Sequence, residues 1–290
     1  MPDLLIASCA EALGRDDDEP LLVAALAARG VTARAADWAD PAVDWAADLV
    51  LVRSTWDYAR RRPEFLAWAE RVERVATLLN PAAVLTWNTD KVYLRDLAAA
   101  GVPVVPTGWV GPGDDAVAAV AAWPGDVVVK PAVSAGARDT ARFAPADRDA
   151  AVAHVRALVD GGRTAMVQPY LERLDGEGET GLVHLDGAYS HAFGKGALLA
   201  AGPLGEGLFA EETITARTAT DEQRALGDRV VAWAADRSGG PLLYARVDLV
   251  PGADGTPQVI ELELTEPSLN LAVADGAADR FADAVVARLG

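Results

Sequence analysis

The chain has 290 residues, 51% of them hydrophobic, and a formal net charge of −17 from 43 acidic and 26 basic side chains. This length allows two or three domains with buried cores, and so much negative charge disfavours nucleic acids and anionic membranes as partners. The single cysteine, Cys9, excludes an internal disulfide, and the lack of a signal peptide or of about 20 consecutive apolar residues predicts a cytoplasmic protein.

Residues 1–84 predict a small parallel sheet with helices. An amphipathic run at 20–29, ended by Gly30, and a run after Arg62-Pro63 have the apolar spacing of helices. The expected strands are 4–8, 32–38 and 48–55. Strands alternating with helices are typical of a parallel α/β layer.

Residues 85–164 predict a second unit of mixed strands and helices. We expect a helix at 89–100 ended by Gly101, and a short helix after Gly113. The remaining elements are strands at 102–110 and 126–133 and a helix at 147–159.

Residues 165–290 predict a third unit rich in strands. A turn at Asp186-Gly187 joins two strands into a hairpin, because such pairs favour tight hairpin turns. The expected elements are strands 165–171, 181–187, 188–198, 242–250 and 257–264, a helix at 220–237 and a terminal helix.

Two strands of this third unit carry alternating charges. Arg246 and Asp248 share one face of the first strand, and Glu261 and Glu263 share one face of the second. A short turn brings the strands side by side, so three carboxylates and one guanidinium meet on a common surface. Carboxylate oxygens suit Mg²⁺, which keeps phosphate oxygens in its shell, so this surface predicts a metal-bound phosphate. A solvated edge with alternating charge is the alternative.

Lysine is scarce in this chain and therefore informative. Only Lys91, Lys130 and Lys195 occur, whereas arginine carries the rest of the basic charge. Lys130 ends an apolar run and precedes the small stretch 134–138, a combination that suits phosphate binding by an ammonium and backbone N–H groups. An ordinary surface lysine is the alternative. Walker, HExxH, CxxC and GxSxG motifs are missing, and the GxGxxG match at 176–181 lacks the strand-then-helix context.

In this order the segments resemble the ATP-grasp superfamily over residues 85–272, with the preceding layer as its usual N-terminal domain. The resemblance rests on WNTDK (87–91), VVVKPAVSAGAR (127–138), MVQPYLE (166–172), AFGKG (192–196), YARVDLV (244–250) and VIELELTEP (259–267). It implies an α/β ATP-grasp fold in which two α+β lobes grip ATP. It assigns the nucleotide to Lys91, Lys130, Ser134, Gly136, Gln168, Pro169, Tyr170, Leu171, Glu179 and Lys195. It assigns Mg²⁺ to Asp248, Glu261 and Glu263, and catalysis to Arg246 with Lys130.

The resemblance also implies an activity. In this superfamily a substrate carboxylate attacks the γ-phosphate of ATP, gives an acyl phosphate and ADP, and is then captured by a nucleophile. One departure is Glu261-Leu262-Glu263, where the superfamily commonly has Glu-x-Asn; both side chains ligate Mg²⁺ through oxygen.

Residues 52–58 (VRSTWDY) resemble the subfamily of cyclo-ligases that close the ring of D-cycloserine from O-ureidoserine. The segment lies at the end of a strand, where open parallel sheets bind ligands. We therefore expect an amino-acid-like substrate to be held by Arg53, Ser54, Asp57 and Tyr58. A pair between Arg53 and Asp57 that only fixes the turn is the alternative.

Several alternatives stay open at this point. Capture of the acyl phosphate is internal, which makes a ring, or external, which makes an amide. A nucleotide-binding sensor without transfer chemistry and an acidic scaffold are the other classes, although the scaffold explains none of the lysines. Analogy with the superfamily suggests a homodimer, and the glycine-rich segment 202–212 is either a mobile cover or an exposed turn.

Overall fold

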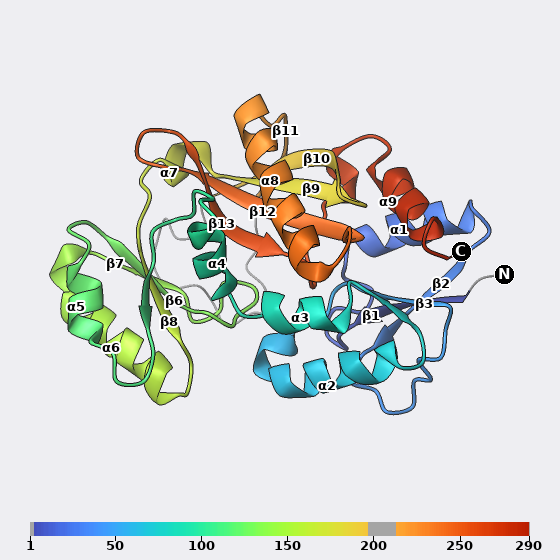
Figure 1. The fold of residues 1–290 in the computed structure, drawn as a ribbon, viewed down its shortest axis with the longest axis horizontal. Coiled ribbons are helices and arrows are strands. Elements are labelled where there is room, and N and C mark those ends of the chain that lie inside the picture. Colours follow the sequence, from blue (N-terminus) through green and yellow to red (C-terminus); the bar gives the residue numbers. More distant parts are fainter. Residues whose placement is uncertain (1–2, 197–212, 290) are drawn as a thin grey trace.

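The computed structural model describes residues 3–196 and 213–289, and therefore leaves the segment 202–212 outside the described part. Three sheets follow one another along the longest axis of the molecule (Figure 1). The mixed α/β architecture expected from the sequence is confirmed. No helix within the described ranges is long and apolar enough to cross a membrane.

The N-terminal sheet is parallel, with strand order β2-β1-β3-β4. Its strands are β1 (Asp3–Ser8), β2 (Thr32–Asp37), β3 (Leu49–Val52) and β4 (Thr77–Leu79), and its helices are α1 (Asp18–Ala27), α2 (Arg62–Glu73) and α3 (Ala82–Asn88). Strands β1 and β3 are buried along nearly their whole length, as expected of parallel strands covered on both faces. The parallel layer is as predicted, but β4 and α3 were not expected, because segments this short carry little periodicity.

The central sheet has the order β5-β8-β6-β7 and is antiparallel throughout. Its strands are β5 (Gly108–Val110), β6 (Val127–Pro131), β7 (Ala141–Phe143) and β8 (Ala165–Pro169), and the helices of this region are α4 (Tyr93–Ala99), α5 (Ala116–Ala121) and α6 (Arg148–Asp160). Strand β8 was expected in the third unit, whereas it pairs with β5 and β6 of the central sheet. The division into three units otherwise stays a prediction.

Two central elements are shorter than the sequence predicts. The helix expected at 89–100 begins only at Tyr93, because the backbone N–H of Lys91 donates to the carbonyl of Ala132 instead of entering a helix. The strand expected at 102–110 is reduced to β5. Its first half instead bonds to the edge of the C-terminal sheet. The N–H of Val105 donates to the carbonyl of Val259, and the N–H of Val259 donates to the carbonyl of Pro103.

The C-terminal sheet is antiparallel, with the order β11-β10-β9-β12-β13. Its strands are β9 (Glu179–Leu185), β10 (Ala188–Lys195), β11 (Ile214–Arg217), β12 (Tyr244–Pro251) and β13 (Pro257–Glu263), and the helices of this region are α7 (Leu174–Glu177), α8 (Asp221–Ser238) and α9 (Ala277–Val286). The predicted hairpin is confirmed: β9 pairs with β10, and Asp186 and Gly187 have the positive φ angles, 51° and 78°, that a tight hairpin turn requires.

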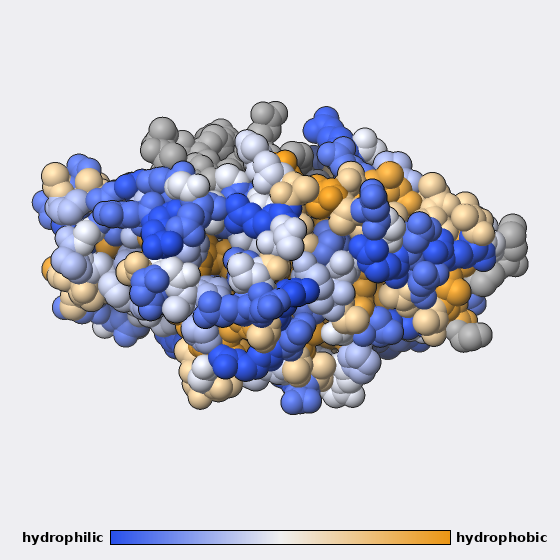
Figure 2. Space-filling view, turned by 90° about the horizontal axis from the view of Figure 1, so that it is seen from above, coloured by the Kyte–Doolittle hydropathy of each residue, from blue (hydrophilic) through white to orange (hydrophobic). Residues whose placement is uncertain are grey.

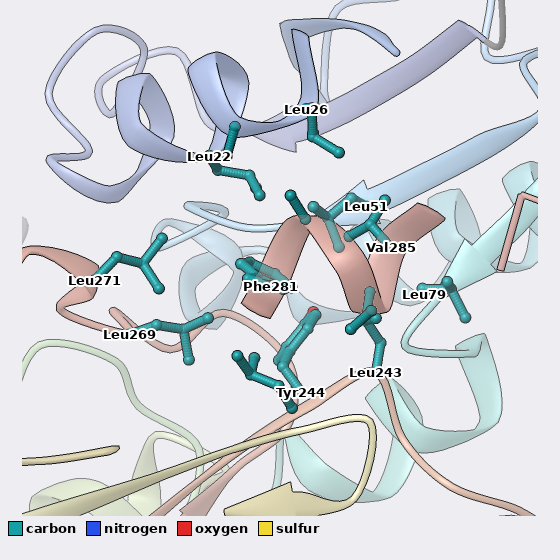
Figure 3. Packing of buried hydrophobic residues seen from close by; sticks show 14 of the residues in the cluster. Leu22, Leu26, Leu51, Leu79, Leu243, Tyr244, Leu269, Leu271, Phe281 and Val285 are labelled. Atoms are coloured by element: carbon teal, nitrogen blue, oxygen red, sulfur yellow. The ribbon is translucent and has the colours of Figure 1, made fainter. Parts of the chain in front are cut away.

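The last helix returns to the first sheet. Helix α9 packs on α1, and Phe281 and Val285 of α9 are fully buried in one core with residues of β1, β3 and β12 (Figure 3). Figure 3 also shows Leu269 and Leu271 of the preceding loop pointing into the same core. The N-terminal layer and the C-terminal sheet therefore share a hydrophobic core.

The outer surface is polar, as expected from the many acidic and basic residues of the chain. The face shown in Figure 2 is mostly hydrophilic, with small, separated apolar patches over its described part. Such a surface is normal for a globular protein and does not by itself indicate a docking site.

Candidate active site

One cavity of about 570 Å³ lies where the three sheets meet. This volume falls within the roughly 300–1,000 Å³ typical of small-molecule sites. Its walls come from the loop before α1, from β6 and β8 of the central sheet, and from β10, β12 and β13 of the C-terminal sheet. The predicted residues that line it are Lys91, Lys130, Ser134, Gly136, Gln168, Pro169, Tyr170, Leu171, Glu179, Lys195, Arg246, Glu261 and Glu263.

The end of the cavity beside the central sheet is mostly apolar. Gln168, Pro169, Tyr170 and Leu171 lie there, on β8 and the chain that follows it. The amide nitrogen of Gln168 donates to Oγ1 of Thr107 at 2.8 Å, which fixes the side chain of Gln168. We call this end of the cavity the apolar slot; apolar side chains with a few fixed polar groups suit an aromatic ring such as a nucleobase.

Tyr170 is held from both sides. Its hydroxyl donates to Oδ1 of Asp175, and the guanidinium carbon of Arg142 lies 3.5 Å from the centre of its ring. Burial and the carboxylate of Asp175 raise the pKa of Tyr170 to about 12, so it stays neutral at physiological pH.

The sequence analysis missed several apolar residues of this slot, namely Val105, Val128, Leu174 and Ile260. Val128 follows from the alternation of β6, because it lies two residues before Lys130 on the same face. Ile260 does not follow from alternation. The pairing of β12 with β13 shifts between Asp248 and Leu249, which leaves Ile260 unpaired and allows Ile260 and Glu261 both to face the cavity.

Lys91 and Lys195 are buried and paired with acids. The ammonium of Lys91 lies 3.0 Å from Oε1 of Glu261 and donates to the carbonyl of Ser134 at 2.9 Å. The ammonium of Lys195 lies 2.7 Å from Asp248 and 2.9 Å from Glu179. Burial disfavours the charge on Lys91, but Glu261 and the neighbouring glutamates outweigh it and raise the pKa of Lys91.

Lys130 differs from the other two lysines. It is equally buried, at 8% exposure, yet it forms no hydrogen bond or ion pair with any residue within 3–196 or 213–289. Burial therefore lowers its pKa to about 8, with Lys91 and Lys195 adding repulsion. A buried ammonium on a cavity wall, with no partner in the part of the chain that the structure describes, is suited to pair with an anionic ligand.

Arg246 lies at the centre of the charged end. It donates to both oxygens of Asp248 at 2.8 Å, to Glu263 at 2.5 Å, and to the carbonyl of Ser268 at 3.0 Å. These bonds follow from the register of the two strands, which places Arg246 opposite Glu263 and Asp248 opposite Glu261. The two strands lie side by side, as predicted.

The three carboxylates have different protonation behaviour. Burial opposes the charge on Asp248, but Arg246 and Lys195 lower its pKa to about 2. Burial, together with repulsion from Glu261 and Asp248, raises the pKa of Glu263 to about 7 despite its bond to Arg246. One acid is thus held ionised while its neighbour titrates near neutrality.

The three carboxylates expected to bind Mg²⁺ lie close together, but each of them is paired with a basic side chain. Asp248 pairs with Lys195 and Arg246, Glu261 with Lys91, and Glu263 with Arg246. Within the described ranges no three acidic, histidine or cysteine side chains are gathered as a ready metal site. The donor set still fits Mg²⁺, which commonly uses one or two protein carboxylates and takes its other ligands from phosphate and water.

Ser134 and Gly136 lie in a turn-rich loop after β6 that lines the cavity. Gly136, Ala137 and Asp139 have positive φ angles of 63°, 53° and 55°. Successive backbone N–H groups in such a loop can turn toward one anion, which agrees with the predicted phosphate role.

The four residues expected to hold the substrate do not line this cavity. Arg53 is buried behind the wall, 3.4 Å from Asp18, and its guanidinium carbon lies 5.6 Å from the ring centres of Tyr244 and Phe281. The alternative expectation, a pair between Arg53 and Asp57, is not found among the described residues. The carboxylate of Asp57 instead accepts from the indole of Trp38 at 2.7 Å and from Arg61 at 3.2 Å.

Ser54 and Tyr58 are also buried. The hydroxyl of Ser54 bonds to that of Ser8 at 2.8 Å, and Tyr58 packs in the core of the N-terminal layer. The end of strand β3 does approach the site as predicted, but the side chain it presents is Trp56, whose indole N–H donates to the carbonyl of Glu266. In this loop the alternation that would expose Arg53 is broken, because residues 53–55 lie beyond the strand.

The wall of the charged end is completed by residues that the sequence analysis did not single out: Arg15, Asp16, Asp17, Asp18, Trp56, Glu266, Ser268 and Asn270. Apart from Trp56, which follows β3, they come from the start of α1 with the loop before it and from the loop after β13, about 250 positions apart in the chain. No local pattern links two segments so distant. Burial and repulsion from Glu263 raise the pKa of Glu266 well above its ordinary range.

Comparison with known proteins adds independent information. Residues 4–80 match the sequence model of a family described as D-cycloserine synthetase DcsG, N-terminal domain. The chain is 43% identical over 298 positions to the cycloserine biosynthesis protein DcsG of Streptomyces lavendulae, covering 99% of this chain and 98% of that protein. The crystal structure of D-cycloserine synthetase DcsG has a TM-score of 0.93 at 42% identity, over 99% of this chain and 100% of that one.

More distant structures share the fold alone. An ATP-grasp RimK domain protein from Sphaerobacter thermophilus has a TM-score of 0.68 at 20% identity, over 98% of each chain. D-alanine–D-alanine ligase from Bacillus anthracis has a TM-score of 0.69 at 15% identity, over 100% of this chain and 97% of that one.

Proposed function

Because the chain belongs to the DcsG family of ATP-grasp enzymes, which are ADP-forming carbon–nitrogen ligases, we propose that it activates a small amino-acid-like carboxylate as an acyl phosphate and closes a ring through the substrate's own nitrogen. The observation that supports the first half is the buried ammonium of Lys130, for which the described residues provide no hydrogen bond or ion pair, in the same cavity as Arg246. Similarity to a cycloserine biosynthesis protein over 99% of the chain supports the second half.

The nucleotide fits the cavity in one direction. The base would enter the apolar slot beside Gln168 to Leu171, the ribose would lie near Glu179, and the phosphates would reach Lys91, Lys130 and Lys195. The buried charge of Lys130, which forms no hydrogen bond or ion pair within the described residues, supports this direction. Mg²⁺ held by Asp248, Glu261 and Glu263 would supply charge neutralisation on the phosphates.

The transfer needs positioning and charge stabilisation rather than a protein nucleophile. A substrate carboxylate oxygen attacks the terminal phosphorus, the bond to ADP breaks, and the substrate nitrogen then attacks the acyl carbon and expels phosphate. Arg246 would stabilise the charge that develops in both steps. Its four bonds to Asp248, Glu263 and Ser268 hold the guanidinium in place before the substrate arrives.

The test is ADP release with Mg²⁺ and ATP across a panel of amino acids that includes O-ureido-D-serine, each with and without a second amine. A cyclic product by mass spectrometry supports the proposal, a condensed amide shows intermolecular ligation, and tight ATP binding without turnover shows a sensor. Lys130→Met should abolish turnover while the circular dichroism spectrum is unchanged. Arg156→Met, which removes an exposed cation from α6, is the matched control and should turn over normally.

A further inference from the structure

Asp18 joins the first helix to the loop that follows the last strand. Its Oδ2 accepts from the backbone N–H groups of Leu269 at 2.6 Å and Asn270 at 3.0 Å, and its Oδ1 accepts from that of Leu271 at 2.6 Å. Arg53 lies 3.4 Å away as its counter-ion. The carboxylate is 4% exposed and bonds to three consecutive amides on a segment about 250 positions away.

This arrangement is not an ordinary helix cap. An acidic residue in the first turn commonly stabilises a helix through the N–H groups of its own first turn. The helix α1 starts at Asp18, but this side chain bonds to the other loop and makes no cap hydrogen bond in α1. The side chain of Asp18 therefore stabilises the loop after β13 and not the start of α1.

The loop alternates between the core and the cavity. Leu269 and Leu271 are buried at 0% and 2% exposure and point into the shared core (Figure 3). Between and beside them, Ser268 and Asn270 line the cavity, and Asn270 has a positive φ of 52°. Asparagine adopts this left-handed conformation more readily than most residues other than glycine, so it suits a turn at this position.

Further contacts run from the same loop to the charged end. The carbonyl of Ser268 accepts from Arg246 at 3.0 Å, and the carbonyl of Leu269 accepts from Nε2 of His191 at 2.8 Å. None of the contacts of Asp18 reaches the adenine slot formed by residues 168–171. The loop thus shapes one end of the cavity only.

We propose that Asp18 is a positioning residue that holds Ser268 and Asn270 at the substrate end, and so sets the affinity for the carboxylate substrate and not for the nucleotide. This inference rests on the proposed function, because it takes the end beside Arg246 as the substrate end. With the tether removed, the three amides lose their acceptor, and residues 268–271 sample other conformations.

The test uses Asp18→Ala and Asp18→Asn, the second as the milder change should the first fail to fold. The matched control is Asp279→Asn, which also removes a carboxylate contact between the α1 region and the C-terminal segment, through Arg29 on the surface, but does not touch the loop. Two readouts are compared: amide hydrogen exchange of peptides spanning 266–272, and KM for the carboxylate substrate beside KM for ATP.

Faster exchange of the loop in the Asp18 variants and a rise in the substrate KM on the order of tenfold, with the KM for ATP changed less than about twofold, are expected. Unchanged exchange, or equal loss of affinity for ATP and substrate, would overturn the inference. The two proposals fail separately: a wild-type enzyme that releases no ADP with any carboxylate contradicts the proposed function, whereas the exchange comparison requires no turnover.

Discussion

The ammonium of Lys91 lies 3.0 Å from Oε1 of Glu261, so a proposed phosphate ligand of one lobe is paired with a proposed metal ligand of the other. Lys195 and Asp248, both on the C-terminal sheet, form a second pair of a proposed phosphate ligand with a proposed metal ligand, at 2.7 Å. The site therefore neutralises its own charges before ligands enter. An incoming phosphate would bind the lysines, which frees the carboxylates for Mg²⁺. Mg²⁺ would bind the carboxylates, which frees the lysines for the phosphate.

This exchange predicts strong coupling between metal and nucleotide. The dissociation constant of a non-hydrolysable ATP analogue should fall by at least about tenfold when Mg²⁺ is added, measured by isothermal titration calorimetry. Glu261→Gln frees Lys91, so it should strengthen metal-free binding and reduce the coupling. Glu222→Gln, on the exposed first turn of α8, is the control. Equal coupling in both variants would contradict the exchange.

Lys130 predicts a dependence of stability on pH. Its pKa is about 8 in the folded protein against an ordinary value of 10.5, so the unfolded chain binds more protons between these values and stability rises with pH across this window. Below pH 8 the buried charge carries its full penalty. Lys130→Met should therefore be more stable than wild type at pH 7 by about 2 kcal/mol, with the difference shrinking toward pH 10. Urea unfolding at pH 7 and 9.5 measures this, and a constant difference would be against it.

The surroundings of Gly181 leave no room for a side chain at this position. It lies opposite Asp248 on β9, and a Cβ there would come within 2.5 Å of the ring of Phe193, over which Arg246 lies at 6.0 Å. Gly181→Ala should lower the free energy of unfolding by about 1–3 kcal/mol and reduce turnover, because the displaced ring presses on Arg246.

The control for this prediction is Gly176→Ala in α7, where a Cβ meets nothing within 4 Å. Alanine there should be neutral or stabilise by up to about 1 kcal/mol, since glycine is a poor helix former. Urea unfolding and ADP release give both quantities. Tolerance of alanine at Gly181 would show that Phe193 moves freely.

The side chain of Asn88 should contribute to stability, because it bonds to the edge of the C-terminal sheet. Its amide donates to the carbonyl of Leu262 at 2.7 Å and accepts from the N–H of Leu264 at 2.8 Å and from Thr265. Asn88→Ala should cost about 1–3 kcal/mol, because buried groups of the edge strand lose their partners. Thr86→Ala in the same helix should change the unfolding free energy by less than about 0.5 kcal/mol. Equal effects in chemical denaturation would exclude the special role of Asn88.

The charged end of the site was predictable because it depends on local periodicity. Alternation in two strands joined by a short turn is enough to place Arg246, Asp248, Glu261 and Glu263 together. The scarcity of lysine added three further residues, all of which line the cavity. The parallel layer and the hairpin were also predictable from the sequence, since both follow from strand length and turn chemistry.

The proposed substrate end was not predictable, for a physical reason. Its wall joins residues near 15–18 with residues near 266–270, and only the folded chain brings these together. The segment 52–58 reaches the site as expected, but Trp56 and not Arg53 faces the cavity, because the strand ends at Val52. Strand β8 was assigned to the wrong sheet because a single apolar run does not specify its partners.

The packing of α9 on the first sheet has a consequence for biosynthesis. Leu4, Ile6 and Leu51 of the first sheet share a core with Phe281 and Val285, which the ribosome adds roughly 230 residues or more after them. During translation the apolar face of this sheet therefore stays without its partner until residues 277–286 have emerged. Such exposed surface promotes aggregation, so the nascent chain should depend on chaperones until the last helix docks.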